Sequence, residues 1–163
     1  MIFVTRSIKK ISCFIISILI PLSIGFLSSI LTKNSFDYYQ TLIKPFFSPP
    51  GWIFAPVWTI LYILMGIASY RIAKSDNSTI LIKNALFFYV LQLILNFLWP
   101  ILFFRFNLTF IAFIEIIILL VFIIITTLKF YNLDKFSAYL MIPYILWVSF
   151  ASLLNFSIWF LNK

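Results

Sequence analysis

Apolar residues fill most of the chain, and short polar or proline-rich breaks divide them into five long stretches. Each stretch has about the 20 residues that an α-helix needs to cross the hydrocarbon core of a bilayer. The stretches cover about residues 11–31, 52–72, 81–104, 108–129 and 136–161. The pattern therefore predicts an all-α fold, an integral membrane bundle of five transmembrane helices.

The breaks leave little room for a second domain. The only sizeable connection is residues 32–51, and no internal repeat or Gly/Ser linker is present. The first stretch follows three basic residues, as a secretory signal does, but its apolar run is too long and no small-x-small cleavage site follows. We expect one domain, residues 1–163, with residues 32–51 as a loop between the first two helices.

Composition agrees with a lipid environment and excludes several classes of site. The chain is 64% hydrophobic and 10% charged, whereas soluble domains are about 45–50% apolar. Its net charge of +8 is not gathered on a polar face, so we expect no nucleic-acid partner. With no histidine and only Cys13, the chain has no intrachain disulfide, structural zinc site or histidine-ligated haem.

The basic residues predict an orientation in the membrane. If the N-terminus is cytoplasmic, eight basic residues lie inside and four outside, which agrees with the positive-inside rule. The inner set is Arg6, Lys9, Lys10, Arg71, Lys74, Lys83, Lys129 and Lys135, and the outer set is Lys33, Lys44, Arg105 and Lys163. We expect an N-in, C-out protein of a bacterial cell membrane, with the long loop outside.

Three of the expected helices carry aromatic, small and amide residues on one face, since residues three, four and seven apart lie together. These stripes are Ala55, Trp58 and Tyr62, then Gln92, Asn96 and Trp99, then Trp147, Ala151 and Leu154 with Asn155 beside them. One interpretation is that the amides bond neighbouring helices and the small residues allow close packing. For the three stripes together we favour a pocket open toward the outer side, because polar groups inside a membrane are commonly functional.

Two further features bear on this pocket. Residues 44–52 read Lys-Pro-Phe-Phe-Ser-Pro-Pro-Gly-Trp, a stiff aromatic loop that is either a lid or a tight connector to the second helix. Glu115 is the only acid inside an expected span, and Arg105 would lie about 15 Å away along the helix. We expect Glu115 to be neutral and hydrogen-bonded.

Several segments resemble the TspO/MBR family, the translocator proteins, which are also called tryptophan-rich sensory proteins or peripheral-type benzodiazepine receptors. They are Lys44-Pro45 with residues 49–62, residues 92–100 with Phe103-Phe104, residues 143–155, and the acid-containing segment 112–115. The resemblance covers four of the five expected helices, in the family's order. It implies a five-helix bundle, often a homodimer, with a pocket capped by the first loop.

The resemblance also implies the ligands. Family members bind porphyrins and, in some cases, sterols or synthetic isoquinoline and benzodiazepine compounds. Carried over by position, the ligand-binding residues would be Phe54, Ala55, Trp58, Tyr62, Asn96, Trp99, Trp147, Ala151 and Leu154. Because histidine is absent, we expect the porphyrin to be a metal-free or weakly ligated ligand, and no cofactor.

Some positions depart from the family's pattern. Tyr38 and Phe47 stand where the family commonly has tryptophan. The cholesterol-recognition pattern needs a tyrosine where this chain has Phe156, and no basic residue follows before Lys163, so sterol binding is expected to be weak.

The sequence thus predicts a receptor or translocator-type membrane protein that binds porphyrin-like tetrapyrroles and has a transport or sensory role. Two alternatives remain open. Some relatives are associated with light-dependent porphyrin breakdown, and Trp58 occupies a position involved there. A secondary transporter of small amphipathic molecules is the other, although five helices offer no even inverted repeat. Gly25 and Ser29 form a small-xxx-small pair that would suit a homodimer.

Overall fold

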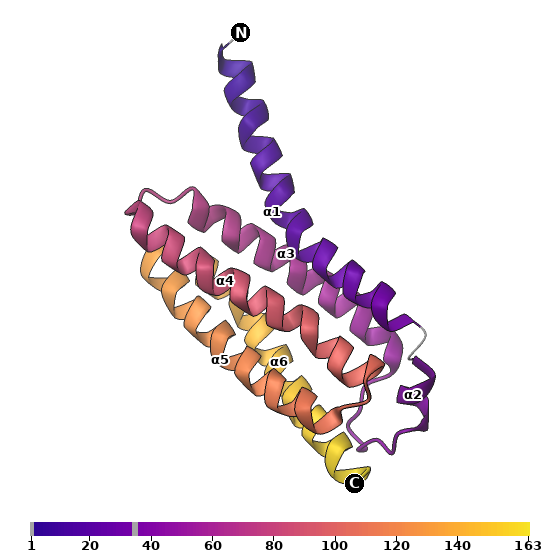
Figure 1. The fold of residues 1–163 in the computed structure, drawn as a ribbon. Helices are drawn as coiled ribbons and strands as arrows, with labels where there is room; N and C mark the ends of the chain where they lie inside the picture. The colour runs from indigo at the N-terminus through magenta and orange to yellow at the C-terminus, as the bar shows by residue number, and fades with distance from the viewer. Residues whose placement is uncertain (1, 34–35) are drawn as a thin grey trace.

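The chain folds into a bundle of long helices in the computed structural model, which describes residues 2–33 and 36–163 (Figure 1). Five helical segments are long and apolar enough to cross a membrane. They are α1 (Ile2–Thr32), α3 (Phe54–Ala73), α4 (Thr79–Pro100) with the η3 segment (Ile101–Arg105), α5 (Thr109–Leu133) and α6 (Lys135–Leu161). The described residues contain no β-strand, so the prediction of an all-α membrane bundle is confirmed.

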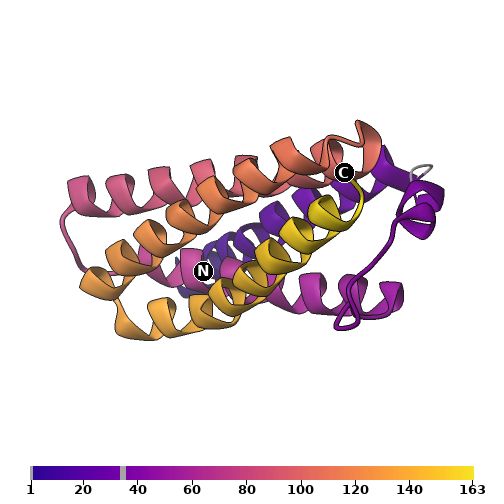
Figure 2. The ribbon, with the colours of Figure 1, turned by 90° about the horizontal axis from the view of Figure 1, so that it is seen from below.

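The five segments form a closed ring. Helix α1 packs on α3, α3 on α6, α6 on α5, α5 on α4, and α4 on α1 (Figures 1 and 2). Tyr144, Met65, Met141 and Leu119 are fully buried inside the ring. Large apolar side chains such as Leu128 and Leu146 are exposed on its outside, as a multi-pass membrane protein requires.

The third span is not a uniform helix. Pro100 has no N–H to donate to the carbonyl four residues earlier, and directly after it the chain widens into the π-helix η3. The amide of Phe106 then donates to the carbonyl of Ile101 at 3.0 Å. Asn107 adopts a left-handed conformation with φ 57° and turns the chain into α5, a conformation that asparagine tolerates better than most residues.

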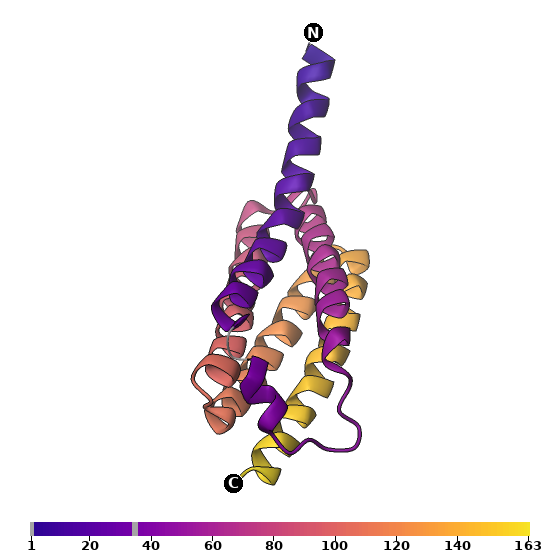
Figure 3. The same ribbon diagram turned by 90° about the vertical axis from the view of Figure 1, so that its right-hand side faces the viewer.

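One end of the bundle gathers the long loop, η3 and the C-terminal residues (Figure 3). The loop contains the short helix α2 (Phe36–Thr41) and leads into the 3-10 turn η2 (Gly51–Ile53). The Ile43 amide donates to Oδ1 of Asn162 at 2.9 Å, and Nδ2 of Asn162 donates to the Ile43 carbonyl at 2.9 Å. We call this the loop end, and the opposite end, with the α3–α4 and α5–α6 connections, the turn end.

Helices α1 and α3 approach each other closely at two glycines. A Cβ atom on Gly66 would lie 2.5 Å from the Cα of Ile18, and one on Gly25 would collide with the ring of Tyr62. Gly25 is therefore used for packing within the chain. Gly25 therefore gives no support to the expected homodimer, which stays a prediction.

At the turn end, Asp134 joins three elements. Its carboxylate accepts hydrogen bonds from Nε and Nη2 of Arg71 at 2.7 and 3.2 Å, and it caps α6 by accepting from the amide and hydroxyl of Ser137 at 3.3 and 2.6 Å. The hydrogen bond from Arg71 lowers the pKa of Asp134 to about 2, with further lowering from Ser137. Asp134 thus stays ionised at physiological pH.

We expect Asp134→Asn to lower the unfolding free energy by about 0.2–1 kcal/mol, because this half-exposed ion pair is lost while an amide can still cap α6. Asp134→Ala should cost about 1 kcal/mol more, since the cap is lost as well. Because the pKa is depressed in the folded state, the ion pair contributes fully above the ordinary Asp pKa of about 3.9 and is lost as pH falls toward 2. Thermal unfolding in detergent between pH 3 and 7 measures this, and equal stability of all three proteins at pH 7 would refute it.

Candidate ligand-binding cavity

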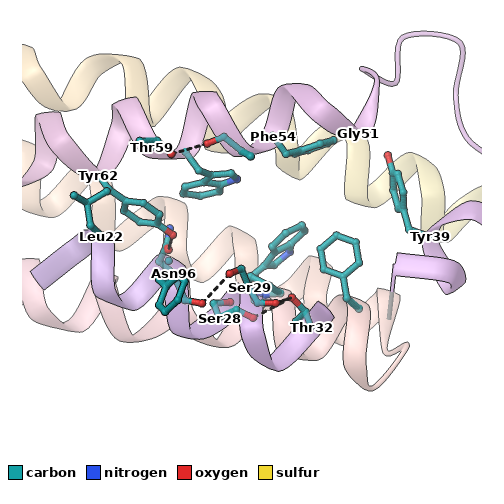
Figure 4. Close-up of a pocket in the computed structure, with 17 residues that line it drawn as sticks. Leu22, Ser28, Ser29, Thr32, Tyr39, Gly51, Phe54, Thr59, Tyr62 and Asn96 are labelled. Carbon is teal, nitrogen blue, oxygen red and sulfur yellow. Dashed lines mark hydrogen bonds between the residues drawn. The ribbon is translucent and has the colours of Figure 1, made fainter. Parts of the chain in front are cut away.

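A cavity of about 610 Å³ lies between α1, α3 and α4 near the loop end (Figure 4). This volume falls within the range of about 300–1,000 Å³ that is usual for small-molecule sites. The lining residues are Leu22, Gly25, Phe26, Ser28, Ser29 and Thr32 of α1, Tyr39 and Gly51 of the loop region, Phe54, Ala55, Trp58, Thr59 and Tyr62 of α3, and Asn96, Trp99, Pro100 and Phe104 of the third span. The structure thus brings together Phe54, Ala55, Trp58, Tyr62, Asn96 and Trp99 from the predicted set.

Aromatic rings form two of the walls. On α3, Trp58 stacks on Tyr62 with ring centroids 5.4 Å apart. On the third span, Trp99 stacks on Phe103 at 5.3 Å and meets Phe104 edge-on at 5.8 Å. A spacing of four residues places the rings of the first two pairs beside each other on a helix, and Phe104 lies in the wider π-helical segment η3. Flat apolar surfaces therefore face the cavity from two sides.

A chain of buried hydrogen bonds runs from the cavity into the bundle. The Tyr62 hydroxyl donates to Oδ1 of Asn96 at 2.7 Å, Nδ2 of Asn96 donates to the Tyr144 hydroxyl at 2.8 Å, and that hydroxyl donates to Oε1 of Gln92 at 2.9 Å. These bonds join α3, α4 and α6. The amides therefore act as interhelical hydrogen-bonding groups, which is the first of the two interpretations that the sequence left open, while Asn96 also lines the cavity.

Asn155 fixes the orientation of Trp99. Its Oδ1 accepts from the indole Nε1 of Trp99 at 2.9 Å, and its Nδ2 donates to the carbonyl of Thr109 at 2.8 Å. One amide on α6 thus links the third span to the first turn of α5. The Trp99 ring lines the cavity, while its N–H is bonded to Asn155.

The predicted residues of α6 lie behind these walls. Ala151 and Leu154 line a separate void of about 20 Å³ together with Phe54 and Trp99. Trp147 is half-buried, with its ring centroid 5.9 Å from that of Phe54. None of the three α6 residues lines the large cavity.

Sequence reasoning missed the wall formed by α1. Its cavity-lining residues include the small or hydroxyl-bearing residues Gly25, Ser28, Ser29 and Thr32 at helical spacing, which was the available signal. Thr32 donates to the carbonyl of Ser28 at 2.9 Å, and Ser29 to that of Phe26 at 2.8 Å. The Ser28 hydroxyl is buried and has no hydrogen-bond partner in the described part of the chain.

The loop covers the end of the cavity through Tyr39 of α2. This side chain is 5% exposed, and its hydroxyl lies 3.2 Å from that of Ser48. Its ring meets Phe54 and Phe104 edge-on, and Nζ of Lys44 lies 4.3 Å from its centroid. Tyr38 and Phe47, which depart from the family's tryptophans, are outside the cavity lining.

Glu115 on α5 lies outside the cavity. It is 7% exposed, and neither carboxylate oxygen has a hydrogen-bond partner in residues 2–33 and 36–163. The expectation of a hydrogen-bonded Glu115 is therefore wrong. The buried amides and phenols of Asn96, Tyr144 and Gln92 make their hydrogen bonds to one another, and Nε2 of Gln92 likewise has no partner in the described residues.

Comparison with known proteins supports the resemblance. The family model described as the TspO/MBR family matches residues 17–160, which include every residue of the cavity lining. A protein named Tryptophan-rich protein TspO from Chlorobaculum tepidum is 38% identical over 155 residues, 94% of this chain and 98% of its own. A protein of the same name from Archaeoglobus fulgidus is 43% identical over 147 residues, covering 90% and 94%. The Translocator protein of Bos taurus is 35% identical over 145 residues, covering 86% and 85%.

We expect Asn96→Leu to lower the unfolding free energy by about 1–3 kcal/mol, because the hydroxyls of Tyr62 and Tyr144 each lose a partner inside the bundle. Gln92→Leu removes one of these bonds and should cost less. The control is Asn84→Leu, which changes an exposed amide on the same helix. Thermal unfolding in detergent would refute the role of this chain if Asn96→Leu were as stable as Asn84→Leu.

Proposed function

Since the chain belongs to the TspO/MBR family, we propose that it is a receptor or translocator-type membrane protein whose cavity binds porphyrin-like tetrapyrroles. The observation that carries the proposal is a large cavity inside the membrane-spanning region with aromatic walls on two sides. Relatives named Translocator protein and Tryptophan-rich sensory protein suggest that binding serves transport or sensing. Both roles are part of the proposal for this chain.

The walls suit a flat apolar ring. The indole N–H of Trp99 donates to Asn155 and the hydroxyl of Tyr62 donates to Asn96, so the donor hydrogens of these two aromatic side chains are already used within the protein. Because a ligand that comes from lipid gains little from leaving water, the complex is stabilised mainly by the many close contacts between the macrocycle and these walls. Each ring-on-ring contact adds about 0.5–1.5 kcal/mol.

The edge of the ligand would meet the loop end. A porphyrin carries propionate groups, and two cations lie at this end of the cavity wall: Lys44 contacts the ring of Tyr39, and Arg105 follows the lining residue Phe104. Charge-assisted contacts with these cations would orient the ring. Because the sequence lacks histidine, we propose a metal-free ring bound as a ligand. Sterols and isoquinolines would occupy the same apolar space without the carboxylate contacts, and therefore bind more weakly.

We expect the purified protein to bind protoporphyrin saturably in the dark, measured by the shift of the Soret band. Trp99→Ala should weaken binding about tenfold, which corresponds to about 1.4 kcal/mol, because one wall loses its stacking surface. The matched control is Trp159→Ala, which removes an indole that packs on Phe110 outside the cavity. Absence of saturable binding, or equal affinities of the two variants, would refute the proposed site.

We also propose the N-in, C-out orientation, from the bias of basic residues, and a bacterial cell membrane as the location. In a Cys13→Ser background, a membrane-impermeant maleimide added outside intact cells should label Phe46→Cys, which lies exposed in the long loop. It should not label Ser78→Cys, which is exposed at the turn end. The reverse pattern would show that the protein is inserted the other way.

A further inference from the structure

One side of the cavity is open. Four of its lining residues are exposed, and they lie on two helices only: Phe26 and Ser29 on α1, and Ala55 and Thr59 on α3. Phe26 is 65% exposed. The lining residues of the third span are buried or half-buried. The opening therefore lies between α1 and α3.

The paths of the two helices explain the opening. The helices are in close contact at Gly66 and Gly25, toward the middle of the bundle. From there α1 and α3 diverge toward the loop end (Figure 3), where α1 contacts η3. The aromatic side chains of α3 and of the third span leave the space between these diverging helices unfilled.

The opening is at membrane depth and has an apolar character. All four exposed residues belong to spans, and Ala55 and Thr59 lie in the first two turns of α3. The hydroxyls of Ser29 and Thr59 donate to the carbonyls of Phe26 and Ala55, both at 2.8 Å. A hydroxyl group whose hydrogen is bonded in this way costs little free energy where it faces hydrocarbon. At the loop end, by contrast, buried Tyr39 lies over the cavity.

We propose that this opening is a portal through which ligand passes sideways between the cavity and the hydrocarbon layer. The ligand class is a flat, largely apolar compound that partitions into the half of the bilayer at the loop end, with its polar groups at headgroup level. Where the ligand is a porphyrin, the inference rests on the proposed function. The portal itself rests on the position of the exposed lining residues.

The first test measures how fast protoporphyrin binds to and leaves the protein in phosphatidylcholine vesicles, by stopped-flow absorbance. Phe26→Ala removes the most exposed ring beside the opening and should speed both association and dissociation about threefold or more. A lower barrier to passage through the opening speeds association and dissociation by the same factor. The control is Leu27→Ala, on the same helix, exposed and outside the cavity lining. Equal rates in the two variants would refute the portal.

A larger side chain among the four exposed lining residues should narrow the opening and slow exchange of the ligand. Thr59→Trp should slow both rates about tenfold, whereas Ile60→Trp, its neighbour exposed outside the cavity lining, should leave them unchanged. Ser48→Ala removes the hydroxyl contact with Tyr39 at the loop end and should also leave the rates unchanged. Faster exchange in Ser48→Ala together with unchanged rates in Thr59→Trp would place the route at the loop end and overturn the proposal.

A ligand-independent readout separates this proposal from the proposed function. Benzophenone dissolved in the vesicles is mixed with the protein and flashed after increasing delays, and labelled cavity residues are mapped by mass spectrometry. Labelling that Thr59→Trp delays and Ile60→Trp does not would support the portal even if the wild type failed to bind porphyrin. Equal labelling in both variants would refute the portal even if porphyrin bound well.

Discussion

Hydrogen bonds between a few buried polar side chains hold the cavity walls in place. In a bilayer the lipid tails are as apolar as the helix surfaces, so helices gain little by hiding apolar side chains from water. Position must then come from close packing and from polar groups that find partners inside. The chain from Tyr62 through Asn96 and Tyr144 to Gln92 does this for α3, α4 and α6, and the glycine contacts do it for α1 and α3.

The same bonds give the cavity its chemical character. Tyrosine and tryptophan each have a flat apolar face and one polar group. In Tyr62 and Trp99 that polar group donates a hydrogen bond to an amide oxygen on another helix. What remains toward the cavity is aromatic surface. A cavity assembled in this way offers flat aromatic surface more than free hydrogen-bonding groups.

The spans were predictable because bilayer thickness sets helix length and few charges interrupt the apolar runs. The stripes on α3 and on the third span were also informative, since helical spacing identifies a shared face. Helical spacing does not show, however, whether a residue lies at the cavity surface or behind another side chain. The rings of Phe54 and Trp99 are large enough to fill the space in front of Ala151, so the α6 stripe became a second layer.

Other features depend on contacts that no local pattern shows. From the sequence alone, Gly25 could allow close packing between two helices of one chain or of two chains. Only the position of Tyr62 shows that the contact is within the chain. Glu115 was expected to find a partner because a membrane acid usually does, yet neither of its carboxylate oxygens has one in the described residues. The widening at η3 follows from Pro100, which lacks an N–H, and this was visible in the sequence. Whether a helix kinks or widens at a proline depends on the helices packed around it, which the sequence does not show.

The pairing between Asn162 and Ile43 has a practical consequence. Both hydrogen-bonding groups of the Asn162 amide reach the backbone of Ile43, two residues beyond the end of α2, so the end of α6 and the cover of the cavity are mechanically joined. Anything attached after Lys163 is therefore attached, in effect, to the cover. A purification tag or fluorescent protein fused there would pull on the loop, whereas one fused before α1 would sit at the opposite end of the bundle (Figure 1).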